Sequence, residues 1–391
     1  MKVPTIFLET AIQDLCKWVS AGSTPLRSRA DFYDGGTIDW YKTGELKDWY
    51  LGAANERITE RALKETSVKL FPANTVLMAM YGDGKTITSM GILRAPATTN
   101  QACSAMLVDE EKCDQRFFFY ALKGRRDLLL KVASGGAQRN LSGKLIKEFA
   151  LPVPPLPVQQ RIAGILSAYD ELIENNQRRI KILEAMARGL YREWFVHFRF
   201  PGHENHPRIP SPLGEIPQGW ELGRLDDVLV LQRGFDLPKS ARIEGTIPII
   251  AATGMTGFHD KAKIKAPGVV TGRSGTIGKV MYVHEDFWPL NTALWVKAFP
   301  NAEPLYAYYV LSSLDLKQFN SGAAVPTLNR NDIHGLKTVV PCRDLQRRFQ
   351  VVAGAMVAQS RNLELQTQNL RRTRDLLLPR LLAGQIDVEA A

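Results

Sequence analysis

The sequence predicts an α/β protein in which two globular α/β domains with curved sheets are separated by a pair of long antiparallel coiled-coil helices. Three observations support this prediction. The same order of motifs recurs in the two halves, two long segments carry a narrow apolar stripe, and the remaining blocks mix short β-rich runs with short helical patterns. A chain of 391 residues is long enough for two or three such domains.

The two halves repeat at an offset of 187 residues, the distance from Ser134 to Ser321. Ser134-Gly-Gly-Ala-Gln-Arg-Asn-Leu-Ser142 then aligns with Ser321-Gly-Ala-Ala-Val-Pro-Thr-Leu-Asn329, and Gln159 falls on Gln346 without a gap. Upstream, after a small shift, Thr99-Asn100-Gln101-Ala102 aligns with Leu290-Asn291-Thr292-Ala293. A repeat this long predicts two copies of a whole domain rather than a solenoid.

Residues 1–150 are predicted to form the first α/β domain and residues 219–338 the second. Thr75–Tyr81 and Gly268–Thr271 have the composition of strands, and Gln115–Val132 and Leu305–Phe319 that of helices. Residues 201–218 are rich in proline and glycine, so they are predicted to be a linker rather than an element.

Residues 151–200 and 339–391 are predicted to contain the long helices, each of about 38 residues and therefore roughly 57 Å at 1.5 Å per residue. The predicted packing stripe of the first is Ile162, Ile165, Tyr169, Leu172, Ile180, Leu183, Ala187, Leu190 and Trp194, with polar Asn176 among them. That of the second is Leu345, Phe349, Val352, Met356, Leu363, Leu370, Leu377 and Leu381, with Gln359, Gln366 and Thr373 between them. Stripes this narrow favour two helices packed on each other, and polar residues in them would fix the register. The alternative is two ordinary amphipathic helices on separate cores.

The composition gives a formal charge of +10 and a pI near 9.4, which favours a polyanionic partner, although a solvated basic surface is the alternative. Glycine-flanked loops at 81–86 and 272–279 occupy corresponding places in the two halves and carry cations. Glycine allows close backbone approach, so such a cation can meet a phosphate or a guanine edge, whereas in a plain tight turn it would point to water. The candidate DNA-contacting residues are Lys85, Arg139, Lys144, Arg233, Arg273, Ser274, Lys279 and Arg330.

Catalytic motifs are missing. Gly84-Lys85-Thr86 and Gly278-Lys279 resemble the end of a phosphate-binding loop, but in both places the first glycine is not at the required spacing. Cys16, Cys103, Cys113 and Cys342 are far apart and predict reduced thiols, with no metal site. Without a signal peptide or an uncharged run of about 18 residues, the sequence predicts a cytoplasmic protein that does not enter a membrane.

The chain resembles the specificity subunits of type I restriction-modification enzymes over essentially its whole length. Gly22-Ser-Thr-Pro25 with Tyr33-Asp-Gly-Gly-Thr-Ile-Asp-Trp-Tyr-Lys-Thr-Gly44, and Leu213-Gly-Glu-Ile-Pro-Gln-Gly-Trp220, resemble the openings of that family's two recognition domains. Pro154-Pro-Leu-Pro-Val-Gln-Gln-Arg-Ile162 and Leu377-Leu-Pro-Arg-Leu-Leu-Ala-Gly-Gln-Ile386 resemble the start of its central helix and the end of its C-terminal helix. The second half lacks a clear counterpart of Asp34–Trp40, and Ile247–Thr253 is the candidate replacement.

The resemblance implies a non-catalytic subunit whose two inverted domains each bind one half of a split, asymmetric target in double-stranded DNA. It also implies two methyltransferase subunits that use S-adenosylmethionine, and motor-nuclease subunits that use ATP and Mg²⁺, with no cofactor bound by this chain. The alternatives are a stand-alone DNA-modifying enzyme with an unfamiliar site and a coiled-coil scaffold protein.

Overall fold

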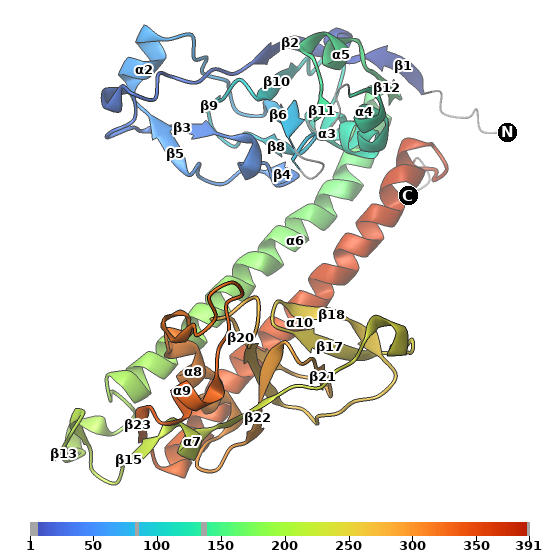
Figure 1. Ribbon diagram of the computed structural model, residues 1–391. Helices are drawn as coiled ribbons and strands as arrows, with labels where there is room; N and C mark the ends of the chain where they lie inside the picture. Colours follow the sequence, from blue (N-terminus) through green and yellow to red (C-terminus); the bar gives the residue numbers. More distant parts are fainter. Residues whose placement is uncertain (1–6, 83–85, 134–138, 389–391) are drawn as a thin grey trace. The chain divides into compact units, whose positions relative to one another are not determined.

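The computed structural model describes residues 7–82, 86–133 and 139–388, and the chain forms two compact units. Unit 1 comprises Met1–Asn176 and Leu365–Ala391, and unit 2 comprises Gln177–Glu364. Each unit is an α/β domain together with part of the long helix α6 (Leu156–Tyr191) and part of the long helix α10 (Arg343–Leu382), both drawn in Figure 1. None of the helices that the structure describes combines the length and the apolar character needed to span a bilayer.

Unit 1 contains three small sheets around one five-stranded sheet, whose strand order is β2-β10-β6-β8-β4. Its strands are β1 (Leu8–Ala11), β2 (Cys16–Ala21), β3 (Ile38–Tyr41), β4 (Trp49–Tyr50), β5 (Glu56–Ile58), β6 (Val76–Ala79), β7 (Tyr81–Gly82), β8 (Met90–Ile92), β9 (Thr98–Thr99), β10 (Cys103–Val108), β11 (Arg139–Asn140) and β12 (Ala150–Val153). Its short helices are α1 (Ile12–Leu15), α2 (Glu60–Glu65), α3 (Gln115–Gly124), α4 (Arg126–Val132) and α5 (Gly143–Glu148). The core lies where α3, which buries Phe117 to Leu122, packs with the strands and the first turns of α6.

Unit 2 has a four-stranded central sheet in the order β16-β22-β19-β20. Its strands are β13 (Arg208–Ser211), β14 (Gly214–Pro217), β15 (Glu221–Arg224), β16 (Val230–Arg233), β17 (Ile247–Ala251), β18 (Gly254–His259), β19 (Gly268–Gly272), β20 (Val280–Val283), β21 (Trp288–Pro289), β22 (Ala293–Ala298) and β23 (Lys337–Val340). Its short helices are α7 (Leu225–Val228), α8 (Pro304–Ser313) and α9 (Arg330–His334). Leu305 and Leu311 of α8 are buried against the sheet and the end of α6.

The predicted duplication is confirmed by the sheets. The pair β1-β12 corresponds to β15-β23, the order β2-β10-β6-β8 to β16-β22-β19-β20, and β5-β3-β9 to β18-β17-β21. Two buried glutamines, 187 residues apart, repeat the same contacts. Gln159 donates to the carbonyl of Pro154 (2.8 Å) and accepts from the N–H of Asp114, while Gln346 donates to that of Pro341 (2.9 Å) and accepts from the N–H of Glu303.

The long helices repeat one burial pattern at spacings of three and four. The buried or half-buried positions that follow this spacing in α6 and the turn after it are Ile162, Leu166, Tyr169, Ile173, Asn176, Ile180, Leu183, Ala187, Leu190 and Trp194. Each has a counterpart 187 residues later, namely Phe349, Ala353, Met356, Ser360, Leu363, Thr367, Leu370, Arg374, Leu377 and Leu381. Unit 1 packs the first part of α6 with the last part of α10, and unit 2 packs the last part of α6 with the first part of α10, so the helices run antiparallel.

The predicted stripe was wrong at two apolar positions. Leu172 is 51% exposed and Val352 is 43% exposed, whereas their neighbours Ile173 and Ala353 are buried. Ile165 is half-buried beside fully buried Leu166. The polar positions predicted within the second stripe are also wrong by one residue, since Ser360 is buried and Gln359 is exposed. An unbroken alternation of steps of three and four residues along the helix passes through Ser360.

The segment predicted as a linker contains an element. The strands β13 and β14 form a two-stranded hairpin whose turn includes Gly214 at a φ of +96°. Phe200 and Trp220 on either side of it are buried and stack with ring centroids 5.7 Å apart. Prolines fit here because a two-stranded ribbon leaves one side of each strand without ladder hydrogen bonds.

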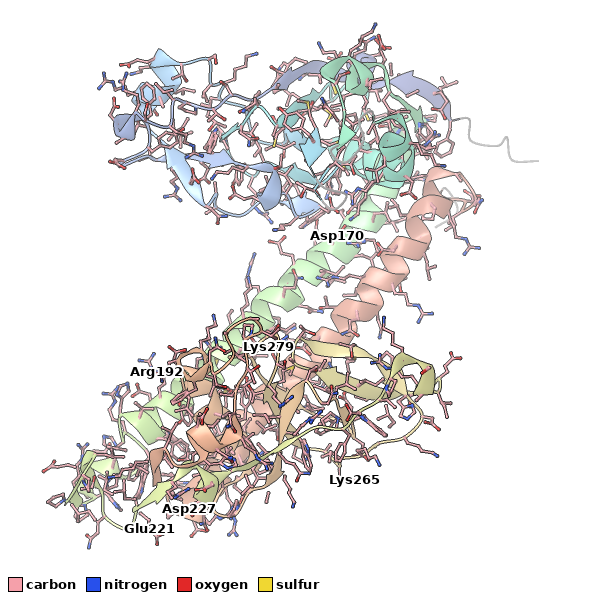
Figure 2. All side chains as sticks on the ribbon, in the orientation of Figure 1. Asp170, Arg192, Glu221, Asp227, Lys265 and Lys279 are labelled. Atoms are coloured by element: carbon pink, nitrogen blue, oxygen red, sulfur yellow. The ribbon has the colours of Figure 1, made fainter. Side chains whose placement is uncertain are left out.

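One buried ion pair in unit 1 joins the two long helices. Arg374 of α10 contacts Asp170 of α6, and the second carboxylate oxygen of Asp170 accepts a hydrogen bond from the phenol of Tyr120 on α3 (2.7 Å); Asp170 is labelled in Figure 2. At the offset of 187, the counterparts in unit 2 are Ala187 and Val357, which both belong to the apolar cluster around Phe349. The same helix contact is therefore ionic in unit 1 and apolar in unit 2.

We predict that Arg374→Ala lowers the free energy of unfolding by about 3–5 kcal/mol, because the Asp170 carboxylate is then buried without its cation. The double variant D170V/R374A, which copies unit 2, should be less destabilised. The Tyr120 hydroxyl is the buried group that loses its partner, at about 1–3 kcal/mol, whereas Asp375, which also pairs with Arg374, is exposed. Urea unfolding of the purified chain measures both. A double variant less stable than R374A would contradict this account.

Candidate nucleic-acid interface

In both units the backbone directly after one strand, β2 or β16, crosses close to the turn that precedes the neighbouring strand, β10 or β22. The N–H of Gly22 donates to Cys103 (3.2 Å), and the N–H of Gly234 donates to Ala293 (3.0 Å). A Cβ atom on Gly22 would lie 2.2 Å from the carbonyl oxygen of Thr99, and one on Gly234 would lie 2.2 Å from that of Leu290. Only glycine allows this approach of the two backbones.

A side-chain hydrogen bond also joins the two segments at each crossing. In unit 1 the hydroxyl of Thr24 donates to the side-chain oxygen of Gln101, and in unit 2 the amide of Asn291 donates to the carboxylate of Asp236. These contacts pair Gln101 with Asn291, so the alignment of this segment predicted from sequence was wrong by one residue. The turn geometry gives the same offset, because Asn100 accepts from the N–H of Cys103 and Leu290 from that of Ala293.

In both units, a residue at the start of the glycine loop pairs with a residue in or after the repeated serine-glycine segment. In unit 1 β7 pairs with β11, and the N–H of Leu141 donates to Met80 (2.8 Å). In unit 2 Ser274 forms a bridge with Thr327, and the N–H of Leu328 donates to Arg273 (2.8 Å). Lys85 and the loop from Ser134 to Gln138 lie outside the described residues.

Three of the candidate residues in unit 2 are held beside this crossing. The guanidinium of Arg273 donates to the carbonyl of Asn291 (3.2 Å), that of Arg233 lies 3.8 Å from the carboxylate of Asp236, and that of Arg330 donates to Leu231 (3.4 Å). Lys279, labelled in Figure 2, makes a different contact. Its ammonium donates to the carbonyl of Thr253 in the turn between β17 and β18 (2.9 Å).

Fewer candidates are described in unit 1. Arg139 lies in β11, opposite Gly82. Lys144 is at the start of α5 and highly exposed, with its ammonium 3.8 Å from the carboxylate of Glu148. The structure therefore brings together Arg233, Arg273, Ser274 and Arg330 in unit 2, whereas the ammonium of Lys279 is bonded to the turn between β17 and β18.

A pocket of about 670 Å³ in unit 2 adjoins this group. Residues 230–236 form one wall, and Arg330, Asn331 and His334 of α9 form another. Lys297 completes the lining, and sequence analysis missed it because a lysine at the end of an apolar strand normally faces solvent. No sequence signal connects Lys297 with Arg233 and Arg330, since the three come together only through strand pairing and the docking of α9.

His334 is a structural part of that wall. Its Nε2 accepts a hydrogen bond from the N–H of Leu231 (3.0 Å), and burial lowers the pKa of its imidazole below the usual value. Because the accepting nitrogen carries no proton, the ring is neutral in this contact. His334 and Arg330 therefore hold the two sides of the Leu231 backbone, and the positive charge of the pocket comes from its arginines and lysine.

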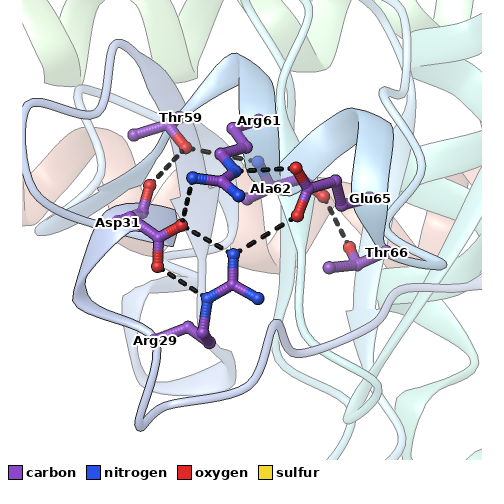
Figure 3. Close-up of polar contacts among 7 residues, drawn as sticks. All are labelled: Arg29, Asp31, Thr59, Arg61, Ala62, Glu65 and Thr66. Atoms are coloured by element: carbon purple, nitrogen blue, oxygen red, sulfur yellow. Dashed lines mark hydrogen bonds and ion pairs between the residues drawn. The ribbon is translucent and has the colours of Figure 1, made fainter.

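Many other cations are already paired. In Figure 3, Arg29 and Arg61 both contact Asp31 and Glu65 where η1 (Ala30–Phe32) meets α2. Hydrogen bonding from Arg29 lowers the pKa of the Asp31 carboxyl to about 2, so this carboxylate stays charged. These arginines are committed to carboxylates, which makes them poor candidates for phosphate contacts.

No group of three or more His, Cys, Asp or Glu residues in the described ranges could hold a metal ion. Burial raises the pKa of the thiols of Cys16 and Cys103 to about 12, so neither is a thiolate nucleophile near neutral pH. The repeated loops and the basic pocket instead suit the binding of a polyanion.

Two copies of one α/β module with cation-bearing loops define a modular binding protein, and comparison with known proteins specifies the kind. Residues 8–185 and 217–348 match the family model "Type I restriction modification DNA specificity domain". The chain belongs to this family of DNA specificity subunits of type I restriction-modification systems.

Related specificity subunits match this chain over most of their own length. The MjaIX specificity subunit of Methanocaldococcus jannaschii is 26% identical over 99% of this chain and 95% of its own length, and the EcoprrI specificity subunit of Escherichia coli is 23% identical over 85% and 82%. The crystal structure of the S subunit from M. genitalium superposes with a TM-score of 0.68 at 17% identity, covering 97% of this chain and 98% of that chain. This likeness confirms the fold, and specificity subunits are non-catalytic components of their enzymes.

We predict that Gly22→Ala and Gly234→Ala each lower stability by about 1–3 kcal/mol, because the new methyl group would overlap a carbonyl oxygen that hydrogen bonds hold in place. Gly44→Ala is the matched control, since a Cβ atom there meets nothing within 4 Å. Thermal unfolding compares the three variants. Equal melting temperatures for all of them would show that the crossing can relax.

Proposed function

We propose that each recognition domain binds one half of a bipartite, asymmetric target in double-stranded DNA, with residues 1–150 reading one half-site and residues 219–338 the other. One observation carries the proposal: the scaffold is duplicated, but the side chains at equivalent loop positions differ. Met80 and Tyr81 stand in unit 1 where Arg273 and Ser274 stand in unit 2, as the contacts of the adjoining strands align them. Two domains that share a backbone framework but differ in the side chains at the contact positions suit two different DNA sequences.

We further propose that α6 and α10 set the gap between the half-sites and dock two methyltransferase subunits. The support is the repeated helix pattern, which places equivalent segments of α6 and α10 together in each unit. The methyltransferase subunits would use S-adenosylmethionine, and motor-nuclease subunits would use ATP and Mg²⁺. The chemistry then belongs to the partners, and the complex works in the cytoplasm, where the DNA is.

Exchanging one recognition domain should change one half-site and leave the other unchanged. The donor is a related specificity subunit of known target, and the exchanges replace residues 1–150 or residues 219–338 in turn. Each chimaera is expressed with its methyltransferase partner, and methylation-site sequencing of the host DNA identifies the target. Simultaneous change of both half-sites in either chimaera would contradict modular recognition.

Lengthening both helices by a heptad should change the gap and keep both half-sites. Duplicating residues 176–182 and the equivalent residues 363–369 preserves the alternation of three and four, so helix packing is retained. Seven residues add about 10 Å, comparable to the rise of about three base pairs. The same sequencing measures the gap. An unchanged gap in a chain that still directs methylation would contradict the spacer role.

A further inference from the structure

The pocket between β16 and α9 in unit 2 has the composition of an anion site. Arg233, Lys297 and Arg330 line it, with Asp236 as the one carboxylate among its lining residues. In the part of the chain that the structure describes, neither Lys297 nor Arg330 has a carboxylate oxygen within 4.0 Å, and the contact of Arg233 with Asp236 is long, at 3.8 Å. Three cations against one anion leave an uncompensated positive charge in the pocket.

The cations are held by contacts that leave donors available. Arg330 uses one guanidinium nitrogen on the carbonyl of Leu231, and a guanidinium carries five N–H donors. The carboxylate of Asp236 is shared, because the amide of Asn291 also donates to it. His334, bonded to the N–H of Leu231, fixes the backbone of β16 against α9 and so fixes the width between Arg330 and Arg233.

Unit 1 does not repeat this arrangement of cations. Gly22 and Gly234 are equivalent by their contacts, so Ala21 stands in place of Arg233. The turn contacts that align β10 with β22 put Leu107 at the position of Lys297. The repeat offset of 187 residues puts Gly143 at the position of Arg330. Lys144 and Lys147 occupy the places of Asn331 and His334, but the three pocket cations have no counterpart.

We propose that this pocket binds backbone phosphate of the DNA duplex next to the half-site that unit 2 recognises. The inference rests on the proposed function, and it names the chemical group and the side chains. Phosphate suits the site better than a base edge, because Lys297 offers a compact charge and the pocket presents several donors without a planar, bidentate arrangement for one base. Such a contact strengthens binding to any sequence and carries no sequence information.

The test measures DNA binding by the full chain with its methyltransferase partner over a series of salt concentrations. Two duplexes are compared, one with the target found by methylation-site sequencing and one with that target scrambled. The variants are Lys297→Gln, R233Q/K297Q and Lys297→Glu. Lys265→Gln is the matched control, because it removes one exposed cation of unit 2 that pairs with Asp286 outside the pocket.

Lys297→Gln should weaken binding to both duplexes by the same factor and reduce the slope of log K against log salt by about 0.9 per lost phosphate contact. The double variant should lose more than the single one, and the charge reversal more than the neutral change, while the methylated sequence stays the same. The Lys265 control should keep the wild-type slope. Unchanged thermal unfolding of Lys297→Gln, whose side chain is exposed, separates lost binding from misfolding.

Two results would overturn the inference. If the double variant binds with wild-type affinity and salt dependence, the pocket does not contact DNA. If only the target duplex is affected and the methylated half-site changes, the pocket reads bases instead. Failure of the proposed function gives a different result, since the wild-type chain would then direct methylation to no bipartite sequence.

Discussion

The rest of the structure depends on one pattern of buried helix positions that occurs in both long helices, α6 and α10. Every buried or half-buried stripe position from Ile162 to Trp194 has its counterpart exactly one repeat later, from Phe349 to Leu381. Because an alternation of three and four averages 3.5 residues per turn, each stripe stays on one side of its helix. A helix packed antiparallel on its own copy brings the start of one against the end of the other, so each α/β domain contains a part of both.

Duplication fixes the backbone and leaves the side chains free to diverge. The glycine crossings and the glutamines Gln159 and Gln346 are kept in both halves, and each satisfies backbone N–H or carbonyl groups by hydrogen bonding. The helix pair also shows divergence, since unit 1 has Asp170 and Arg374 where unit 2 has Val357 and Ala187. An ion pair and an apolar contact of equivalent geometry distinguish the two ends of an otherwise repetitive pair of helices.

The fold was largely predictable from the sequence, and the interface only in part. Periodicity and the repeat gave the two domains and the long helices, but adjacent apolar residues such as Leu172 and Ile173 differ by only 100° around a helix, which hydrophobicity alone cannot resolve. The turn before β10 was misaligned by one residue because its matching asparagines, Asn100 and Asn291, are not equivalent in hydrogen bonding. Lys297 was missed since its neighbours in space, Arg233 and Arg330, are distant in sequence.

The net charge of +10 indicated a polyanionic partner without locating the contact. Arg29 and Arg61 contribute to that total but are neutralised by Asp31 and Glu65, whereas Lys297 and Arg330 contribute equally and lie in a pocket with one carboxylate. What matters for a polyanion is charge left uncompensated at a surface of fitting shape, because a paired cation must first give up its partner. A duplicated scaffold can therefore place its cations differently in two geometrically equivalent domains. Unit 2 has Arg233, Lys297 and Arg330 where unit 1 has Ala21, Leu107 and Gly143, whereas unit 1 has Lys144 and Lys147 where unit 2 has Asn331 and His334.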